Sequence, residues 1–245
     1  MERRNALITG ASRGLGAAIA LGLAEAGFDL TISARGEPGL VSVAQAAQEL
    51  GSIVHVHAAN LRSDEEISGL VAAHAARFGA LDLLVVNAGM GYTYTLAELP
   101  VARFDTIMKI NLRAPFLLIQ EALPLLRAAA ARRAEFGGKV IAVSSLTAVA
   151  SEAGLGAYAA SKAGLASLCQ TQTIEEWEQG VSASVISPGY VATDMTSHLH
   201  ETLPHADMMT PSDVATLVVA MSKLSARASI PALPLTRPGP NIWRA

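Results

Sequence analysis

Hydrophobic positions along this chain fall into two alternating patterns. Short apolar runs rich in β-branched residues are separated by longer segments in which apolar residues recur at helical spacing. The short runs predict six strands, at residues 5–9, 28–33, 52–57, 81–86, 138–144 and 181–187. Because these runs are apolar at most positions, we expect strands that are buried on both faces.

The longer segments predict the helices between these strands. They lie at residues 15–26, 39–50, 64–78, 101–131 and 157–179, with a further helix expected at 212–224 and a seventh strand at 229–238. Regular alternation of strand and helix indicates a parallel sheet with helices on both faces. The expected fold is therefore α/β, a single-domain Rossmann fold over residues 1–245 with a doubly wound parallel sheet of about seven strands.

Local signals mark several helix boundaries. Ser63 and Glu66 have the spacing of a capping box, which predicts that a helix starts there. Gly27, Gly51 and Gly180 each follow a predicted helix, where a left-handed backbone favours glycine.

A long irregular segment follows the sixth predicted strand. Residues 187–213 are rich in proline, histidine and methionine and show no strand pattern, so we interpret them as a substrate-binding lid. The apolar residues of the lid are Met195, Leu199, Leu203, Met208 and Met209. They could contact an apolar substrate, and the packing of the lid itself explains them equally well. No cysteine or compact set of carboxylates accompanies the histidines of this segment, so we expect no metal at His198, His200 and His205.

Composition narrows the class of protein. Of the 245 residues, 51% are hydrophobic and 16% are charged, which suits a compact globule. A formal net charge of −3 disfavours nucleic acid as a partner, and we interpret the pair Arg132 and Arg133 as a solvated helix end. We find no signal-peptide pattern and no uncharged run of the roughly 20 residues that a membrane span needs, so we expect a cytoplasmic protein without a membrane partner. The single cysteine, Cys169, is interpreted as a small buried hydrophobe.

The stretch "TGASRGLG" joins the first predicted strand to the first predicted helix. In a doubly wound sheet this turn receives the pyrophosphate of a dinucleotide at the helix N-terminus. Gly10, Gly14 and Gly16 suit a chain reversal, a close approach of the backbone to phosphate, and close helix packing. The pattern therefore predicts a phosphate cradle.

With its preceding threonine, the spacing G-x-x-x-G-x-G resembles the opening motif of the short-chain dehydrogenase/reductase family. The resemblance implies a nicotinamide cofactor that is contacted by Gly10, Ser12, Arg13, Gly14, Leu15 and Gly16. Further segments extend it: "VNAG" resembles the family's N-N-A-G, with Val86 in place of the first asparagine, and "SPGYVATDM" matches its P-G-x-x-x-T. Asn60 stands where the family usually has aspartate. The additional cofactor contacts implied are Asn60, Leu61, Asn87, Ala88, Gly89, Pro188, Gly189, Val191 and Thr193.

The type of nicotinamide cofactor follows from charge after the second predicted strand. An acidic residue about 20 positions after the glycine motif would bind the ribose hydroxyls of NAD and repel the 2′-phosphate of NADP. Ala34 stands near that position, Arg35 follows it, and Arg13 lies in the glycine turn. Because two guanidinium groups can bind one phosphate through charge-assisted hydrogen bonds, we predict NADP(H), as the family pattern also implies.

The stretch "YAASK" places Tyr158 and Lys162 on one face of a predicted helix, four residues apart. A lysine ammonium beside a phenol favours the phenolate, so the pair suits general acid–base chemistry. Ser145, at the family's spacing before Tyr158, is preferred over Ser144 as the group that polarises a substrate carbonyl. Asn111 matches the family's catalytic asparagine, which implies a proton relay through Lys162. From the helical pattern alone, Asn111 would be structural.

The resemblance implies an NADPH-dependent reductase that delivers hydride to a carbonyl carbon while Tyr158 donates the proton. It also implies that Tyr158 and Lys162 both contact the cofactor. The substrate is expected to be a small-molecule carbonyl compound or a 3-oxoacyl group on an acyl carrier protein, and the sequence leaves both open. Acidic residues near 175–178 disfavour carrier docking, whereas Arg127 and the 132–133 pair leave it possible.

Two further questions stay open at this stage. A non-catalytic NADP(H)-binding regulator on the same fold is the alternative function class. The chain also ends in "LPLTRPGPNIWRA" instead of the family's "VDGG"-like ending, which often helps to build a tetramer. We therefore expect a homodimer or a homotetramer.

Overall fold

The computed structural model describes residues 3–199, 201–239 and 243. Within these residues, seven strands form one parallel sheet in the order β3-β2-β1-β4-β5-β6-β7. The strands are β1 (Arg4–Thr9), β2 (Phe28–Ser33), β3 (Val54–Val56), β4 (Leu83–Val86), β5 (Gly138–Val143), β6 (Val181–Pro188) and β7 (Leu233–Leu235). The predicted doubly wound sheet is confirmed, and its strand order reverses between β1 and β4.

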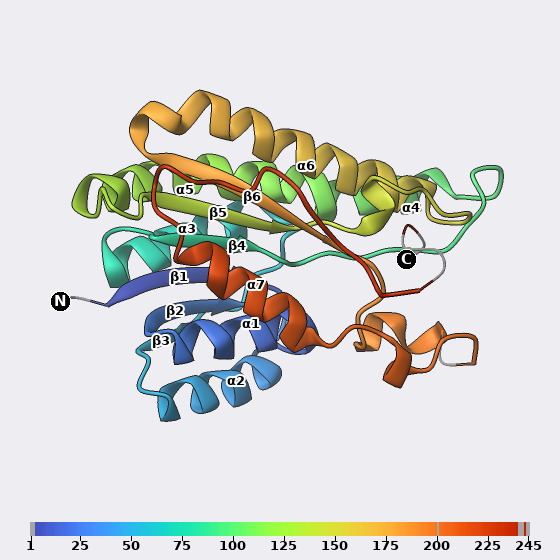
Figure 1. Cartoon of the computed structure of the whole chain (residues 1–245), viewed down its shortest axis with the longest axis horizontal. Coiled ribbons are helices and arrows are strands. Elements are labelled where there is room, and N and C mark those ends of the chain that lie inside the picture. Colours follow the sequence, from blue (N-terminus) through green and yellow to red (C-terminus); the bar gives the residue numbers. More distant parts are fainter. Residues whose placement is uncertain (1–2, 200, 240–242, 244–245) are drawn as a thin grey trace.

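Helices cover both faces of the sheet (Figure 1). One face carries α1 (Gly14–Glu25), α2 (Glu37–Glu49) and α7 (Pro211–Ser222). The other carries α3 (Asp64–Phe78), α5 (Ala114–Arg132) and α6 (Gly156–Glu176). The 3-10 turns η4 (Asp194–Leu199) and η5 (His205–Asp207) lie in the predicted lid, which the orange ribbon places beyond the carboxyl ends of the strands.

Each face of the sheet packs its own apolar layer. Leu7 and Ile8 are neighbours in β1, both fully buried, and they belong to opposite layers. Successive side chains of a strand point to opposite faces, so a strand between two helical layers is apolar at most positions. Burial of both faces is therefore the reason for the continuous apolar runs in the sequence.

Two edge strands depart from this expectation. The run at 52–57 forms only the three residues of β3, all half-buried, because β3 is the edge of the sheet. Its flanking Ser52 turns inward instead, and the Ser52 hydroxyl donates to the Phe28 carbonyl oxygen at 2.7 Å. At the opposite edge, β7 is likewise three residues long.

The predicted continuous helix at 101–131 is wrong in one respect. It is divided into α4 (Val101–Met108), the π-helical turn η1 (Lys109–Arg113) and α5. The π turn holds the one extra residue that lets Asn111 reach its partners, as described below. Together these elements, Val101–Arg132, are long and apolar enough to cross a membrane. Composition alone did not reveal this span. Of its most apolar 18 residues, however, 44% are buried inside the fold. Contacts of α5 with α3 and β5 are those of a core helix.

Most of the predicted helix ends are confirmed, with one correction. Gly27, Gly51 and Gly180 have φ values of 87°, 86° and 72°, as left-handed helix ends require. Ser63 does cap α3, since its hydroxyl accepts from the Glu66 N–H at 3.2 Å. The capping box is incomplete, however, because the Glu66 carboxylate accepts from the Asn60 N–H at 2.8 Å instead.

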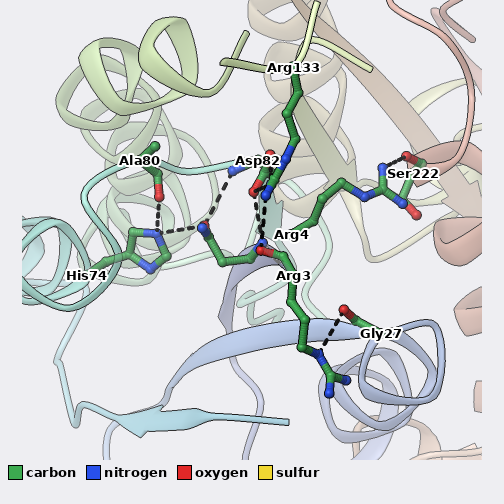
Figure 2. A network of polar contacts seen from close by, with 9 residues as sticks. Arg3, Arg4, Gly27, His74, Ala80, Asp82, Arg133 and Ser222 are labelled. Atoms are coloured by element: carbon green, nitrogen blue, oxygen red, sulfur yellow. Dashed lines mark hydrogen bonds and ion pairs between the residues drawn. The ribbon is translucent and has the colours of Figure 1, made fainter. Parts of the chain in front are cut away.

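A polar network closes the amino-terminal edge of the sheet (Figure 2). Buried Asp82 accepts from the Arg133 guanidinium at 2.8 Å and from the Asn5 N–H at 2.9 Å. Arg133 is therefore an anchor of the sheet and not a solvated helix end. The His74 ring is fully buried beside Asp82's network, with Thr31, Asn5 and the Ala80 carbonyl oxygen as its partners.

Candidate active site

The predicted site residues gather near the carboxyl-terminal ends of the strands. The loops after β1, β4, β5 and β6 contain residues 10–13, 87–91, 144–155 and 189–193. In a parallel sheet these four loops meet at one edge, and the reversal between β1 and β4 opens a crevice there. The sheet topology thus gathers segments that are more than 170 positions apart in the sequence.

The glycine turn has the geometry of a phosphate cradle. Gly10 and Gly14 have φ values of 68° and 54°. A Cβ atom at Gly16 would lie 2.1 Å from the Gly10 carbonyl oxygen, and one at Gly10 would lie 2.9 Å from Asn87 Nδ2, so neither position admits a side chain. No side chain caps α1 at Arg13, which leaves its first-turn N–H groups available to an anion. These features fit the pyrophosphate of a dinucleotide.

Thr9 and Asn87 tie the glycine turn to the loop after β4. The Thr9 hydroxyl accepts from the Asn87 and Ala88 N–H groups, both at 3.2 Å. In return, Asn87 Nδ2 donates to the Thr9 and Gly10 carbonyl oxygens at 3.0 and 3.2 Å. Val86, which departs from the family pattern, is buried in the apolar layer below. The threonine thus stabilises the cradle from beneath.

The lid segment reaches the same cradle. Pro188 ends β6, and the Gly189 N–H donates to the Leu235 carbonyl oxygen at 2.9 Å. Val191 is buried and bridges to Met209, and the Thr193 methyl group would lie 3.4 Å from a Cβ atom at Gly14. Thr193 is therefore beside the first turn of α1.

The two arginines expected to bind the 2′-phosphate, Arg13 and Arg35, lie on adjoining loops, but Arg13 has another partner. Arg13 forms an exposed ion pair with Asp194 of the lid at 2.9 Å. Arg35 is exposed after β2, and the Ala11 N–H, which donates to the Ser33 carbonyl oxygen at 3.0 Å, holds this strand end beside the glycine turn. Both guanidinium groups are thus available from adjoining loops.

The remaining cofactor candidates line the neighbouring loops. Ser12 packs tightly on the start of α2, since its carbonyl oxygen would lie 2.6 Å from a Cβ atom at Gly39. Leu15 packs against the apolar layer of α1, and Leu61 against the opposite layer. Asn60 is engaged locally, because its Oδ1 accepts from the Arg62 N–H at 3.2 Å.

Asn111 links three elements of the site. It is fully buried in η1, and its Oδ1 accepts from the Met90 N–H at 2.9 Å. Its Nδ2 donates to the Met90 carbonyl oxygen at 2.8 Å and to Ser161 Oγ at 3.1 Å. The π turn accounts for an asparagine inside a predicted helix, because it aims this amide inward. Ser161, which the sequence analysis missed, stands between Tyr158 and Lys162 in the same motif.

Lys162 is buried beside this amide. Its Nζ donates to the Val143 carbonyl oxygen at 2.8 Å, and a Cβ atom at Gly89 would lie 3.2 Å from Nζ and 3.5 Å from Asn111 Oδ1. Burial lowers the pKa of Lys162 to about 8. The ammonium group therefore titrates within the range in which acid–base catalysis operates.

Tyr158 lies near Lys162 and Ser145. Lys162 Nζ is 5.8 Å from the centre of the Tyr158 ring, and a Cβ atom at Gly91 would lie 3.2 Å from a carbon of the same ring. Burial raises the pKa of Tyr158, and a hydrogen bond with the Ser145 side chain opposes that rise. The lowering of the Tyr158 pKa expected from the lysine is therefore not found for the chain by itself, because desolvation by burial has the largest effect on this group.

The two serines after β5 have different partners. Ser145 Oγ accepts from the Thr147 N–H at 3.2 Å and from the Thr147 hydroxyl at 2.9 Å, and Ser145 is also joined to Tyr158. Ser144 is turned away, since its hydroxyl donates to the Lys162 carbonyl oxygen at 2.9 Å. This arrangement supports the preference for Ser145.

Other reactive groups stay outside the site. Burial raises the pKa of Cys169 to about 12, in keeping with a small hydrophobic role. Across the described residues, no group of three or more metal-ligating side chains occurs. The side chain of His198 and the whole of His200 fall outside the described part of the lid.

Comparisons with known proteins agree with this geometry. The family model for short chain dehydrogenases matches residues 4–204. The chain belongs to the short-chain dehydrogenase/reductase family. A 3-oxoacyl-[acyl-carrier-protein] reductase from Rickettsia prowazekii is 32% identical over 231 residues, which cover 91% of this chain and 90% of the relative. A D-beta-hydroxybutyrate dehydrogenase from Rhizobium meliloti is 32% identical over 78% of this chain and 73% of its own length.

Solved structures place the chain among nucleotide-dependent members of the short-chain dehydrogenase/reductase family. An alcohol dehydrogenase from Thermococcus sibiricus, complexed with 5-hydroxy-NADP, has a TM-score of 0.85 and 27% identity and covers 97% of this chain and all of its own. A 3-oxoacyl-[acyl-carrier protein] reductase from Brucella melitensis, in complex with NAD, has a TM-score of 0.86 and 29% identity and covers 96% of both chains. The chain is therefore an oxidoreductase of this family that takes a nicotinamide cofactor.

Proposed function

We propose that this short-chain dehydrogenase/reductase is an NADP(H)-dependent oxidoreductase that interconverts a carbonyl compound and its secondary alcohol. The observation that carries the proposal is the buried cluster of Asn111, Ser161 and Lys162 behind Tyr158, at the edge that holds the glycine cradle. The cofactor, when bound, supplies or accepts the hydride at its nicotinamide ring. The protein orients the reactants and moves the proton.

Each side chain has a proposed task in carbonyl reduction. The Tyr158 hydroxyl donates its proton to the substrate oxygen as the carbonyl carbon receives hydride, and Ser145 donates a hydrogen bond to the same oxygen. Lys162 holds positive charge beside the phenolate that remains and binds the cofactor ribose. Asn111 keeps the Lys162 pocket closed through the Met90 backbone and Ser161. Solvent then returns the proton to Tyr158.

The preference for NADP(H) over NAD(H) is the finer part of the proposal. Arg13 and Arg35 are supported as ligands of a 2′-phosphate by their adjoining loops and by the absence of a carboxylate at Ala34. Arg13 would exchange Asp194 for the phosphate, a small cost because both partners of this ion pair are about 70% exposed. The double variant R13Q/R35Q should weaken NADPH binding more than tenfold and leave NADH binding nearly unchanged. A tenfold preference of the unaltered chain for NADH would contradict the assignment.

Between the two substrate hypotheses, we favour a small-molecule carbonyl compound over an acyl carrier protein. Arg127 is bidentate on Glu176 at 2.5 and 2.7 Å, and Arg133 is committed to Asp82. These arginines are therefore engaged within the fold, which argues against their use in docking an acidic carrier.

The alternative, a non-catalytic NADP(H)-binding regulator, is tested together with the enzyme. NADPH oxidation should be followed against a panel of ketones, diketones, quinones and 3-oxoacyl thioesters. We expect turnover of at least one small carbonyl compound. Clear NADPH binding without turnover of any member of the panel would favour the regulator, which has no need of the buried lysine.

We also propose a cytoplasmic homo-oligomer without a nucleic-acid or membrane partner. Support comes from a surface groove of about 940 Å³ between η1, α5 and α6, in which Phe116 is 45% exposed beside Leu112 and Leu168. An exposed aromatic side chain in a groove that is otherwise lined largely by charged and polar residues, among them Asp64 and Arg113, suits a second copy of the chain. Light scattering should give a dimer or tetramer mass that Phe116→Asp reduces, and a monomer mass for the unaltered chain would contradict this part.

A further inference from the structure

A second polar contact crosses the candidate site, and no role described so far uses it. The Tyr190 hydroxyl donates to Glu152 Oε2 at 2.8 Å, and both side chains are half-buried. Glu152 lies in the loop between Ser145 and Tyr158, and Tyr190 comes two residues after the end of β6. The carboxylate is thus held between the two loops that flank the reacting groups.

The loop that carries Glu152 is fixed by its neighbour. The Tyr94 N–H donates to the Gly154 carbonyl oxygen at 2.9 Å. Cβ atoms at Gly154 and Gly156 would lie 3.0 Å from Thr93 and 2.7 Å from Leu96, so the two segments are in close contact. A carboxylate on a loop held this firmly is pre-organised for a ligand.

The loops around this carboxylate are acidic, and one cation contacts them from outside: the Arg103 guanidinium of α4 donates to the Tyr92 hydroxyl at 2.6 Å and lies over its ring. The loops at 87–100, 144–158 and 187–199 contain Glu98, Glu152 and Asp194 but no lysine or arginine, and none occurs between Lys162 and Lys223. Glu98 accepts from the Thr95 hydroxyl. Asp194 pairs with Arg13 in the chain by itself, and the proposed move of Arg13 to the 2′-phosphate would leave a further negative charge at Asp194. Among the ion pairs of the described residues, Glu152 takes no part.

From this arrangement we infer that Glu152 determines substrate specificity and selects a carbonyl compound that carries a protonated amine. The Tyr190 phenol donates a hydrogen bond to one oxygen of the Glu152 carboxylate but does not neutralise its negative charge. The other oxygen can therefore accept a hydrogen bond from an ammonium group of a substrate. A half-buried, uncompensated negative charge also disfavours a substrate carboxylate or phosphate. The substrate class therefore differs from the hydroxybutyrate and carrier-bound acyl groups in the relatives' names.

The inference rests on the proposed reductase function and is tested with paired substrates. One is a neutral ketone, and the other is the same ketone with its terminal methyl group, remote from the carbonyl, replaced by an ammonium group. We expect kcat/KM for the ammonium ketone to exceed that for the neutral one by about tenfold, through KM. In Glu152→Gln the ratio should fall to about one while turnover of the neutral ketone changes little, because the amide oxygen still accepts from Tyr190.

Two further variants separate recognition from structure. Glu178→Gln makes the same charge change beyond α6, at the far end from the site, and should keep the ratio. Tyr190→Phe releases the carboxylate and should keep or raise the ratio. A ratio that is unchanged in Glu152→Gln, or that collapses in Tyr190→Phe, would overturn the inference while the reductase stands. If no ketone is reduced at all, the proposed function fails, and this inference fails with it.

Discussion

The side-chain amide of Asn111 forms a pair of hydrogen bonds with the backbone of Met90, accepting from its N–H at 2.9 Å and donating to its carbonyl oxygen at 2.8 Å. The same amide donates to Ser161 on α6. One buried residue thus joins the π turn, the loop after β4 and the helix that carries Tyr158 and Lys162. The catalytic geometry depends on this junction.

Asn111→Ala should therefore lower both stability and activity. The substitution removes a fully buried amide and leaves the half-buried N–H and carbonyl groups of Met90 without these partners, and we expect a loss of about 2 kcal/mol in the free energy of unfolding. Urea denaturation measures it, with Gln48→Ala on the exposed surface of α2 as a control that stays within about 0.5 kcal/mol. An unchanged urea midpoint in Asn111→Ala would show that these bonds are not structural.

The cradle makes a second prediction. In Gly16→Ala, the new methyl group would lie 2.1 Å from the Gly10 carbonyl oxygen, so the turn must open, and NADPH affinity should fall by more than tenfold. Gly69→Ala is the matched control: nothing lies within 4 Å of its Cβ position, and in α3 it should stabilise the fold by about 0.5 to 1 kcal/mol. Fluorescence titration with NADPH measures the affinities. Equal affinity in both variants would remove the cradle from its assigned role.

The buried His74 makes stability depend on pH. Burial lowers its pKa from 6.5 to about 4, so the unfolded chain binds a proton that the folded chain does not. The contribution of His74 to the free energy of unfolding is fully present above pH 6.5 and is lost as the pH falls toward 4. The total loss is about 3 kcal/mol. Urea midpoints between these pH values should decline steeply for the unaltered chain.

The control for this titration is a pair of histidine variants. His74→Gln should be less stable at neutral pH but show a flatter pH profile, because the titrating group is gone. His205→Gln, in the lid at the opposite edge of the sheet, should keep the steep profile. If the profile of His74→Gln is as steep as that of the unaltered chain, other groups are responsible for the acid sensitivity.

The sheet could be predicted because its signal is local and strong. Residues such as Leu7 and Ile8 are buried against opposite helical layers. Because both faces of such a strand are buried, its sequence is a continuous apolar run. The pattern did not reveal the π turn at Asn111, because the apolar residues before and after this short turn each keep ordinary helical spacing. The role of Arg133 was also hidden, because its partner Asp82 lies 51 positions away.

The candidate site was predictable to the extent that motifs mark it. Glycine, tyrosine and lysine spacings identified residues that the fold brings to one edge. Contacts between loops were not visible: the ion pair of Arg13 with Asp194 and the hydrogen bond of Tyr190 with Glu152 join segments with no shared local pattern. The pKa of Tyr158 was mispredicted for a related reason, since burial depends on what the whole chain packs around it.

Transfer of deuterium from NADPH in which both hydrogens at nicotinamide C4 are replaced by deuterium, compared between the unaltered chain and Tyr158→Phe, tests the central claim most directly. With a ketone from the panel that supports turnover, the unaltered chain should place one deuterium on the carbinol carbon of the alcohol. Tyr158→Phe should bind NADPH equally well and form labelled alcohol at least about a hundredfold more slowly, because the proton donor is missing. Undiminished formation of labelled alcohol by Tyr158→Phe would contradict the account.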